Sequence, residues 1–195
     1  MTDTVHYHLP AYTGYRSNEI GGFVSQLEDL TRRMGEDLSG ATPEELNWQP
    51  APGCNTIGML LAHIAVVEVF WIQVAPLGLQ AYDTRPALGI DIDDDGMPLS
   101  ETGAPPAVLA GRDLAWFTER LRLARVHTIE HLRDVDGTTL LRDFARTRKN
   151  GEVVVVDLRW VLYHVVEHLS GHFGQILLMR HLYRDQGQAG PAAGD

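Results

Sequence analysis

The chain has 195 residues, of which 44% are hydrophobic, and its formal net charge is -10 at pH 7. This length and composition suffice to bury one substantial core, so we expect a single domain over residues 1–195, with residues 186–195 as a disordered tail. An acidic surface repels phosphate groups, so we expect no nucleic acid partner.

The N-terminus and the cysteine content bear on the compartment. The first residues lack a basic stretch followed by an apolar run, and no segment approaches the roughly 18 uninterrupted apolar residues of a membrane span. Cys54 is the only cysteine, so an internal disulfide cannot form. We therefore expect a cytoplasmic protein that has no membrane partner.

Four long segments repeat their apolar residues with helical spacing, which predicts an all-α four-helix bundle. They cover approximately residues 17–38, 56–76, 107–137 and 158–183. Between the second and third segments, residues 78–106 are rich in proline, glycine and aspartate. This stretch is about as long as a crossover connection in a bundle, so the sequence predicts one long crossover connection.

A small β-hairpin is expected just before the last helix. Residues 142–156 place Asn150 and Gly151 between two runs that can extend. An Asn-Gly pair favours a type I′ turn, in which both central residues have φ > 0.

Three histidines spaced four residues apart, His164, His168 and His172, mark the last predicted helix. Side chains at i and i+4 lie on one helical face, about 6 Å apart, so two neutral imidazoles can bind one metal ion. A third ligand must come from another element, and His63 lies in the second apolar helix. Packing these two helices together would create a three-histidine metal site with an open position.

Spacing alone leaves the choice of ligands open. His164 and His168 form the same i, i+4 pair as His168 and His172, and a buried histidine can instead satisfy a hydrogen bond within a core. A rival pair, His127 and His131, lies in the last turns of the third helix. We expect that pair to be mostly solvated, because cationic histidine complements the dipole at a helix C-terminus.

The sequence resembles the DinB/YfiT-like superfamily of bacterial metal-binding four-helix bundles, which includes thiol-dependent transferases and the mycothiol-dependent maleylpyruvate isomerase. The likeness extends from the first helix to the last. Its most specific part is His168-x-x-x-His172-Phe-Gly-Gln175, which is similar to the family's closing His-x-x-x-His-Arg-Gly-Gln signature. Phe173 stands where the family often has arginine, and Gly171 stands where it often has histidine.

The resemblance implies that His63, His168 and His172 are the metal ligands. Three neutral histidines suit zinc, nickel, iron or cobalt, so we expect one divalent transition metal as the cofactor. The resemblance also implies a low-molecular-weight thiol such as mycothiol or bacillithiol, a small-molecule substrate and a homodimer. Adjacent Trp116 and Phe117 favour the dimer because both cannot face one narrow core stripe. One of the two would face a partner or the long connection.

The sequence identifies no catalytic residue, but several side chains have candidate roles. His164 and Glu167 are expected to lie beside the metal ligands. Glu167 and Glu68 would orient ligand imidazoles through their distal nitrogens, or else lie on solvated helix surface. We expect Arg180 to be a solvated charge near a helix end, and Cys54 to be inert, half-buried and too remote to bind the metal.

An acidic stretch in the long connection matches only the opening of an EF-hand loop. Asp91, Asp93 and Asp95 occupy positions one, three and five, and Gly96 occupies position six. Thr102 stands in the place of the bidentate glutamate. We therefore expect a mobile acidic loop in preference to a calcium site.

The three-histidine pattern together with the family resemblance implies a metal-dependent transferase or hydrolase that uses a thiol or metal-bound water as its nucleophile. A first alternative is a non-catalytic metal-binding or stress-associated protein on the same bundle, because a bound metal does not prove turnover. A second alternative is a structural bundle whose histidines satisfy one another. A measurement of metal content distinguishes the structural bundle from the two metal-binding possibilities. A turnover assay distinguishes the enzyme from the non-catalytic metal-binding protein.

Overall fold

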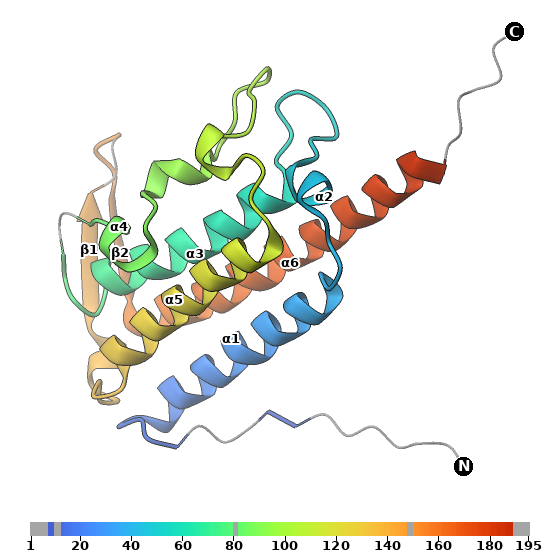
Figure 1. The fold of residues 1–195 in the computed structure, drawn as a ribbon. Coiled ribbons are helices and arrows are strands. Elements are labelled where there is room, and N and C mark those ends of the chain that lie inside the picture. Colours follow the sequence, from blue (N-terminus) through green and yellow to red (C-terminus); the bar gives the residue numbers. More distant parts are fainter. Residues whose placement is uncertain (1–7, 10–12, 80–81, 148–149, 189–195) are drawn as a thin grey trace, which may run out of the picture.

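The structure, a computed structural model, describes residues 8–9, 13–79, 82–147 and 150–188. Four long helices form the bundle (Figure 1): α1 (Asn18–Asp37), α3 (Ile57–Val74), α5 (Leu114–Leu132) and α6 (Leu158–Gln188). An antiparallel hairpin of β1 (Asp143–Thr147) and β2 (Val153–Asp157) lies at one end of the bundle, directly before α6. The predicted all-α bundle with a small hairpin before the last helix is confirmed.

Short helices occupy the connections of the bundle. They are α2 (Pro43–Asn47), α4 (Arg85–Leu88), η1 (Ile92–Asp95), η2 (Ala107–Leu109) and η3 (Thr139–Leu141). The acidic stretch, expected to be a mobile loop, instead contains the short helix η1, whose N-terminus is capped by its own aspartates. The Oδ1 atom of Asp91 accepts a hydrogen bond from the backbone N of Ile92 at 2.7 Å, and Oδ2 of Asp94 accepts one from the backbone N of Asp91 at 2.7 Å.

Gly96 ends η1 and fixes its position against α3. Its φ of +72° lies in the left-handed region, and a Cβ atom here would lie 2.4 Å from Cγ of Pro106. Both the backbone conformation and the close approach therefore require glycine. Because η1 packs against α3, the residue before the turn, Asp95, has its side chain buried there.

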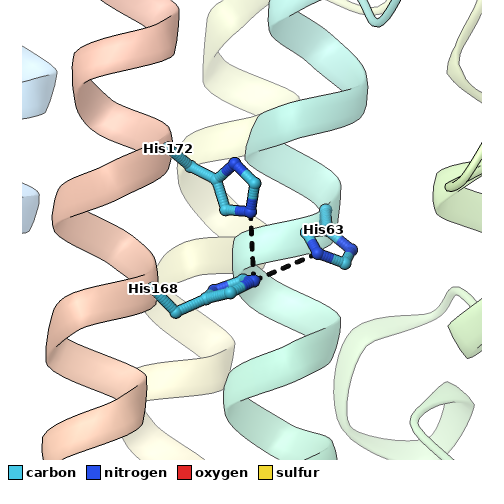
Figure 2. A group of neighbouring side chains, drawn as sticks. All are labelled: His63, His168 and His172. Carbon is cyan, nitrogen blue, oxygen red and sulfur yellow. Dashed lines mark hydrogen bonds between the residues drawn. The ribbon is translucent and has the colours of Figure 1, made fainter.

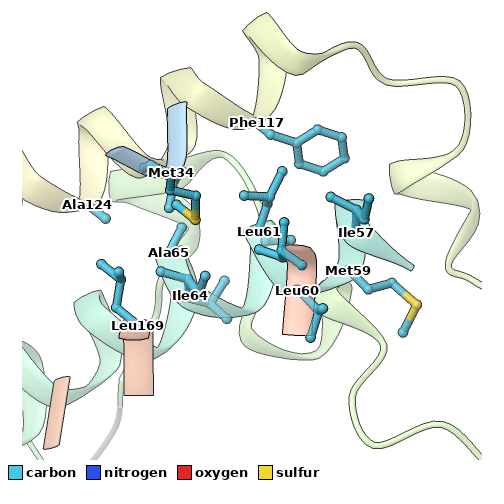
Figure 3. Close-up of a cluster of buried hydrophobic side chains, with 14 of the residues drawn as sticks. Met34, Ile57, Met59, Leu60, Leu61, Ile64, Ala65, Phe117, Ala124 and Leu169 are labelled. Atoms are coloured by element: carbon cyan, nitrogen blue, oxygen red, sulfur yellow. The ribbon is translucent and has the colours of Figure 1, made fainter. Parts of the chain in front are cut away.

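Helix α3 is the central helix and packs against both α5 and α6. Thr56 caps its N-terminus, with Oγ1 accepting a hydrogen bond from the backbone N of Met59 at 3.1 Å. Figure 3 shows that its apolar residues, such as Leu61, share one cluster with Phe117 of α5 and Leu169 of α6. Helix α3 is long and apolar enough to cross a membrane, but 78% of it is buried in the bundle. Core packing therefore accounts for its apolar character.

The hairpin differs from the predicted turn. Thr147 pairs with Val153 at its closed end, so the loop spans residues 148–152, of which 148–149 lie outside the described residues. The predicted type I′ turn, which joins two strands through two residues, is wrong, because this register leaves five residues between the strands. A five-residue loop does not require the two-residue geometry, and Oδ1 of Asn150 instead accepts a hydrogen bond from the backbone N of Glu152 at 3.1 Å.

Two buried ion pairs join the helices. Glu68 of α3 accepts hydrogen bonds from Nε and Nη2 of Arg125 of α5 at 2.9 and 3.0 Å. Arg180 of α6 donates from Nε to Oε1 of Glu45 of α2 at 2.9 Å, and both side chains are buried. The expectation that Arg180 is a solvated helix-end charge is wrong, because α6 continues beyond it and α2 supplies a carboxylate opposite it.

Two further sequence expectations concern surfaces of the bundle. Trp116 is half-buried beneath the guanidinium groups of Arg120 and Arg112, which lie 3.7 and 4.9 Å from its ring centroid, while Phe117 is fully buried. The homodimer stays a prediction. Helix α6 reaches Gln188, three residues into the segment expected as a tail, and residues 189–195 lie outside the described residues.

Candidate metal centre

Three histidine side chains from two helices converge between α3 and α6 (Figure 2). His63 comes from α3, and His168 and His172 lie one turn apart on α6. The Nε2 atom of His168 is 3.1 Å from Nε2 of His63 and 3.1 Å from Nε2 of His172. All three side chains are half-buried, and one ligand atom from each lies within 4.8 Å of the others. The structure thus brings the three predicted ligands together at one point.

Asp95 of η1 holds the ring of His63. The Nδ1 atom of His63 lies 2.7 Å from Oδ2 of Asp95, whose side chain is buried. Because an ionised carboxylate only accepts hydrogen bonds, Nδ1 carries the proton and donates it. The Nε2 atom of His63 therefore presents a lone pair to the other two histidines. The second carboxylate oxygen is also engaged, since Oδ1 accepts a hydrogen bond from the backbone N of Met97 at 2.9 Å.

Gln175 holds the ring of His172 in the same way. The Nδ1 atom of His172 lies 2.8 Å from Oε1 of Gln175, three residues later on α6. An amide oxygen accepts hydrogen bonds, so Nδ1 of His172 donates and its Nε2 also presents a lone pair. Two of the three imidazoles are thereby fixed in the tautomer that directs Nε2 into the cluster.

The arrangement of lone pairs fits a cation better than a proton. A single proton on Nε2 of His168 cannot make full hydrogen bonds to both neighbouring lone pairs, whereas a metal ion can accept all three nitrogens. Two nitrogen ligands at about 2.0–2.1 Å from a tetrahedral zinc ion lie about 3.3 Å apart. The 3.1 Å separations found here are close to that value. The donor set and its spacing therefore fit one metal ion held by three imidazoles.

Burial keeps two of these histidines neutral. The pKa of His168 is lowered to about 3, chiefly by burial and further by the charges of His172, His63 and His164. Burial also lowers the pKa of His172, while its hydrogen bond to Gln175 opposes that change. Neutral imidazole is the form that binds metal, so the surroundings of both rings favour binding at neutral pH.

His164 lies one turn before the cluster and has different neighbours. Its ring stacks on that of Trp160, with the centroids 4.9 Å apart and the planes inclined by 7°, and meets Trp71 edge-on at 5.5 Å. Its Nδ1 atom is 3.3 Å from Oε2 of Glu167. The structure therefore places His164 beside the cluster, with its ring centroid 5.8 Å from that of His168, and does not bring it into the cluster. Glu167 is exposed, and its carboxylate lies against His164.

Glu68 does not orient a ligand imidazole. It lies one turn and a residue after His63 on α3, but its carboxylate faces α5. There it accepts hydrogen bonds from Arg125 and, at 2.7 Å, from Oγ1 of Thr128. Both roles expected for Glu68 are wrong, because the carboxylate is neither beside the histidines nor solvated, with 1% of the residue exposed.

The rival pair on α5 is half-buried, not mostly solvated as expected. The Nδ1 atom of His131 donates a hydrogen bond to the backbone O of His127 at 2.8 Å, and the two rings are 4.3 Å apart. Packing of the α5 C-terminal turns against the bundle explains this burial. Across the described part of the chain, these two histidines belong to no group of three that could hold a metal ion.

Sequence reasoning missed both residues that orient the ligands. Asp95 belongs to the EF-hand-like stretch of the long connection, and nothing in the spacing links it to His63, which lies 32 residues earlier. Gln175 is the last residue of the closing motif, and the motif itself does not indicate that it orients a ligand. Its i, i+3 spacing from His172 on one helix is a signal that could have identified it.

Comparison with known proteins identifies relatives by family and by fold. A family model described as the DinB superfamily matches residues 26–176. No curated protein matches the chain. Among solved structures, a conserved protein from Enterococcus faecalis is similar, with a TM-score of 0.60, 18% sequence identity, and coverage of 82% of this chain and 94% of that chain. At that identity the likeness shows the fold alone.

Proposed function

Because the chain belongs to the DinB superfamily and gathers three imidazole nitrogens at one point, we propose that it is a metal-dependent transferase or hydrolase. The observation that carries the proposal is the convergence of the Nε2 atoms of His63, His168 and His172. Catalytic zinc sites have three protein ligands and one open position, whereas structural zinc sites have four protein ligands. The number of ligands therefore favours catalysis over a structural role.

A bound divalent metal would supply Lewis acidity and lower the pKa of a coordinated water molecule or thiol. The chain itself contributes neutral imidazoles, two of which are held in the required tautomer by Asp95 and Gln175. Such hydrogen bonds fix ring orientation and raise the basicity of the ligand nitrogen. Imidazole ligands suit zinc, nickel, iron and cobalt, and we propose that the bound metal is one of these four.

We propose that the nucleophile is water or a low-molecular-weight thiol that attacks a small-molecule electrophile. Cys54, the only cysteine, is exposed and precedes the capping residue Thr56 of α3, so the protein supplies no thiol within the cluster. The expectation that Cys54 is half-buried is wrong, because it lies in the exposed loop ahead of the helix. An unpaired exposed cysteine and a free thiol substrate both suit the reducing cytoplasm, where we place the activity.

Cobalt substitution tests the thiol proposal directly. Sulfur ligation to Co²⁺ gives charge-transfer absorption that water ligation lacks, so titration with mycothiol, bacillithiol, glutathione or coenzyme A should produce a new band. Binding should release protons near neutral pH, because a metal-bound thiol ionises well below the free value of about 8.5. His168→Ala should abolish the band, and His131→Ala, which changes a half-buried histidine outside the cluster, should retain it.

Turnover assays distinguish a thiol-dependent transferase from a hydrolase and from a non-catalytic metal-binding protein. Thiol-dependent conversion of an electrophile, together with the cobalt band, would support the transferase. Conversion without any thiol would support the hydrolase. Metal binding without turnover of any electrophile would contradict an enzymatic role and leave a non-catalytic metal-binding protein on the same bundle.

A further inference from the structure

A cavity of about 170 Å³ lies beside His164, between the hairpin and the adjoining ends of α3 and α6. We call it the aromatic cleft and define it by Trp71, Phe144, Arg146, Trp160 and His164. Its remaining lining residues are valines of α3 and β2, so no acidic side chain lines it. The cleft is therefore apolar except for one guanidinium group and one imidazole.

The walls of the cleft are aromatic rings in contact with one another. The rings of His164 and Trp160 are stacked, and Trp71 meets both edge-on, at 5.5 Å from His164 and 5.8 Å from Trp160. The ring of His164 is also 5.8 Å from that of His168. His164 thus lines the cleft and lies beside one of the three clustered histidines, so it connects the cleft to the metal centre.

In the part of the chain that the structure describes, Arg146 of β1 is the one charged residue other than histidine that lines the cleft, and it also lines the neighbouring hollow of about 440 Å³. Its guanidinium carbon lies 4.7 Å from the ring centroid of Phe70 and 6.0 Å from that of Tyr82, and these rings hold it by cation-π contacts. Within the described residues it has no carboxylate partner, although the chain as a whole carries a net charge of -10. An unpaired guanidinium in an aromatic setting is suited to bind a planar carboxylate through two parallel hydrogen bonds.

We propose that the aromatic cleft binds a planar ligand of one ring that carries a carboxylate, with the ring against Trp71 and Trp160 and the carboxylate on Arg146. The volume supports this size, because an apolar cavity of about 150 Å³ is known to accommodate benzene. This inference rests on the proposed function in one respect, since it names the substrate class that the adjoining metal centre would act on. Binding itself does not require the metal.

Benzoate and its neutral analogue benzamide are the probes that test the charge requirement. They have nearly the same size and shape, so the ratio of their affinities for the wild-type protein isolates the contribution of the carboxylate. We expect benzoate to bind at least about tenfold more tightly, because hydrogen bonds to charged groups are the stronger ones. Quenching of the fluorescence of Trp71 and Trp160, supported by calorimetry, provides the measurement.

Two arginines of the same strand region provide a matched pair of variants. Arg146→Met should remove the preference for benzoate and leave benzamide binding unchanged, since it keeps an apolar stem of similar length. Arg142→Met is the control, because Arg142 stacks on the ring of Phe144 at 4.8 Å but does not line the cleft. Trp160→Ala should weaken both probes, since both place a ring in the cleft.

Several outcomes would overturn the proposal. One is that wild type and Arg146→Met bind benzoate with equal affinity. Another is that the wild type binds benzoate and benzamide with equal affinity, a comparison that can be made without any variant. Full binding by Trp160→Ala would also overturn it, because the ligand would then occupy the neighbouring hollow of about 440 Å³ that Arg146 also borders.

Each titration is made on metal-free and on zinc-loaded protein, with the metal content of both samples measured. If benzoate binding requires zinc and is unchanged in Arg146→Met, the carboxylate binds the metal. That result would overturn the cleft proposal but not the proposed function. Failure of the protein to bind zinc would overturn the proposed function, while the preference for benzoate in the metal-free protein would still support the cleft.

Discussion

Asp95 and His63 are joined by a hydrogen bond of 2.7 Å between a buried carboxylate and Nδ1 of the ring. The bond connects the long crossover connection to the central helix, so the connection has a role at the candidate metal centre. It leaves Nε2 of His63 unprotonated and directed at the other two histidines.

Removal of that hydrogen bond should weaken metal binding. We expect Asp95→Ala to lower zinc affinity by about 10- to 100-fold, because His63 would lose both its orientation and its fixed tautomer. Competition with a chelator of known zinc affinity measures the change. Asp93→Ala is the matched control, since Asp93 lies on the same short helix but is exposed. An unchanged affinity in Asp95→Ala would show that the hydrogen bond does not support the site.

Gly96→Ala should disturb the same connection through the backbone. Alanine at φ +72° costs about 1–2 kcal/mol, and its Cβ would in addition lie 2.4 Å from Cγ of Pro106. We expect a lower free energy of unfolding in urea together with weaker zinc binding.

By contrast, Gly22→Ala should stabilise the protein by about 0.5–1 kcal/mol, since Gly22 lies inside α1 and a Cβ there meets no atom within 4 Å.

The buried pair of Glu68 and Arg125 should matter far more for stability than an exposed pair. Glu68→Ala leaves a buried guanidinium without its carboxylate and should cost about 3–5 kcal/mol in the free energy of unfolding. Glu19→Ala breaks the exposed pair of Glu19 with Arg159 and should cost less than about 1 kcal/mol. Metal content should be the same in both variants, because neither carboxylate contacts the histidine cluster; loss of metal in folded Glu68→Ala would refute this reading.

The pH dependence of stability should contain a contribution from His127. Its pKa lies below the ordinary value of 6.5, first because of burial and then because of the charge of His131. Below pH 6.5 the unfolded chain binds a proton at His127 that the folded chain resists, so stability falls as the pH is lowered from 6.5 toward the folded pKa.

His127→Gln should remove this contribution. In urea denaturation of metal-free protein between about pH 5 and pH 7, the variant should lose less stability on acidification than the wild type does. His181→Gln, at an exposed position of α6, serves as the control and should follow the wild type. Identical pH profiles for wild type and His127→Gln would contradict the burial effect.

Periodic features of the sequence predicted the fold well. Contacts between segments that are distant in the sequence could not be predicted from this periodicity. The four long helices were visible because apolar residues recur every three or four positions, and the i, i+4 spacing of His168 and His172 placed both on one face of α6. The third member, His63, required knowledge of which helices pack together. The family resemblance supplied that knowledge.

Polar residues were harder to place because spacing does not reveal which neighbour a side chain meets. Glu68 lies on the helix that carries His63, yet its partner is Arg125 on α5. The sequence predicts Arg180 as a solvated helix-end charge, whereas the fold places Glu45 of α2 opposite it. Asp95 belongs to a segment without clear periodicity, and only the folded connection brings it to His63.

The metal content of individual histidine variants tests the central claim most directly. Protein purified without an affinity tag should carry close to one divalent transition metal per chain by elemental analysis. Each alanine variant of the three clustered histidines, His63, His168 and His172, should lose that metal. His164→Ala and His131→Ala should retain it. Full occupancy in all three cluster variants, with loss of metal in either of the other two, would contradict the account.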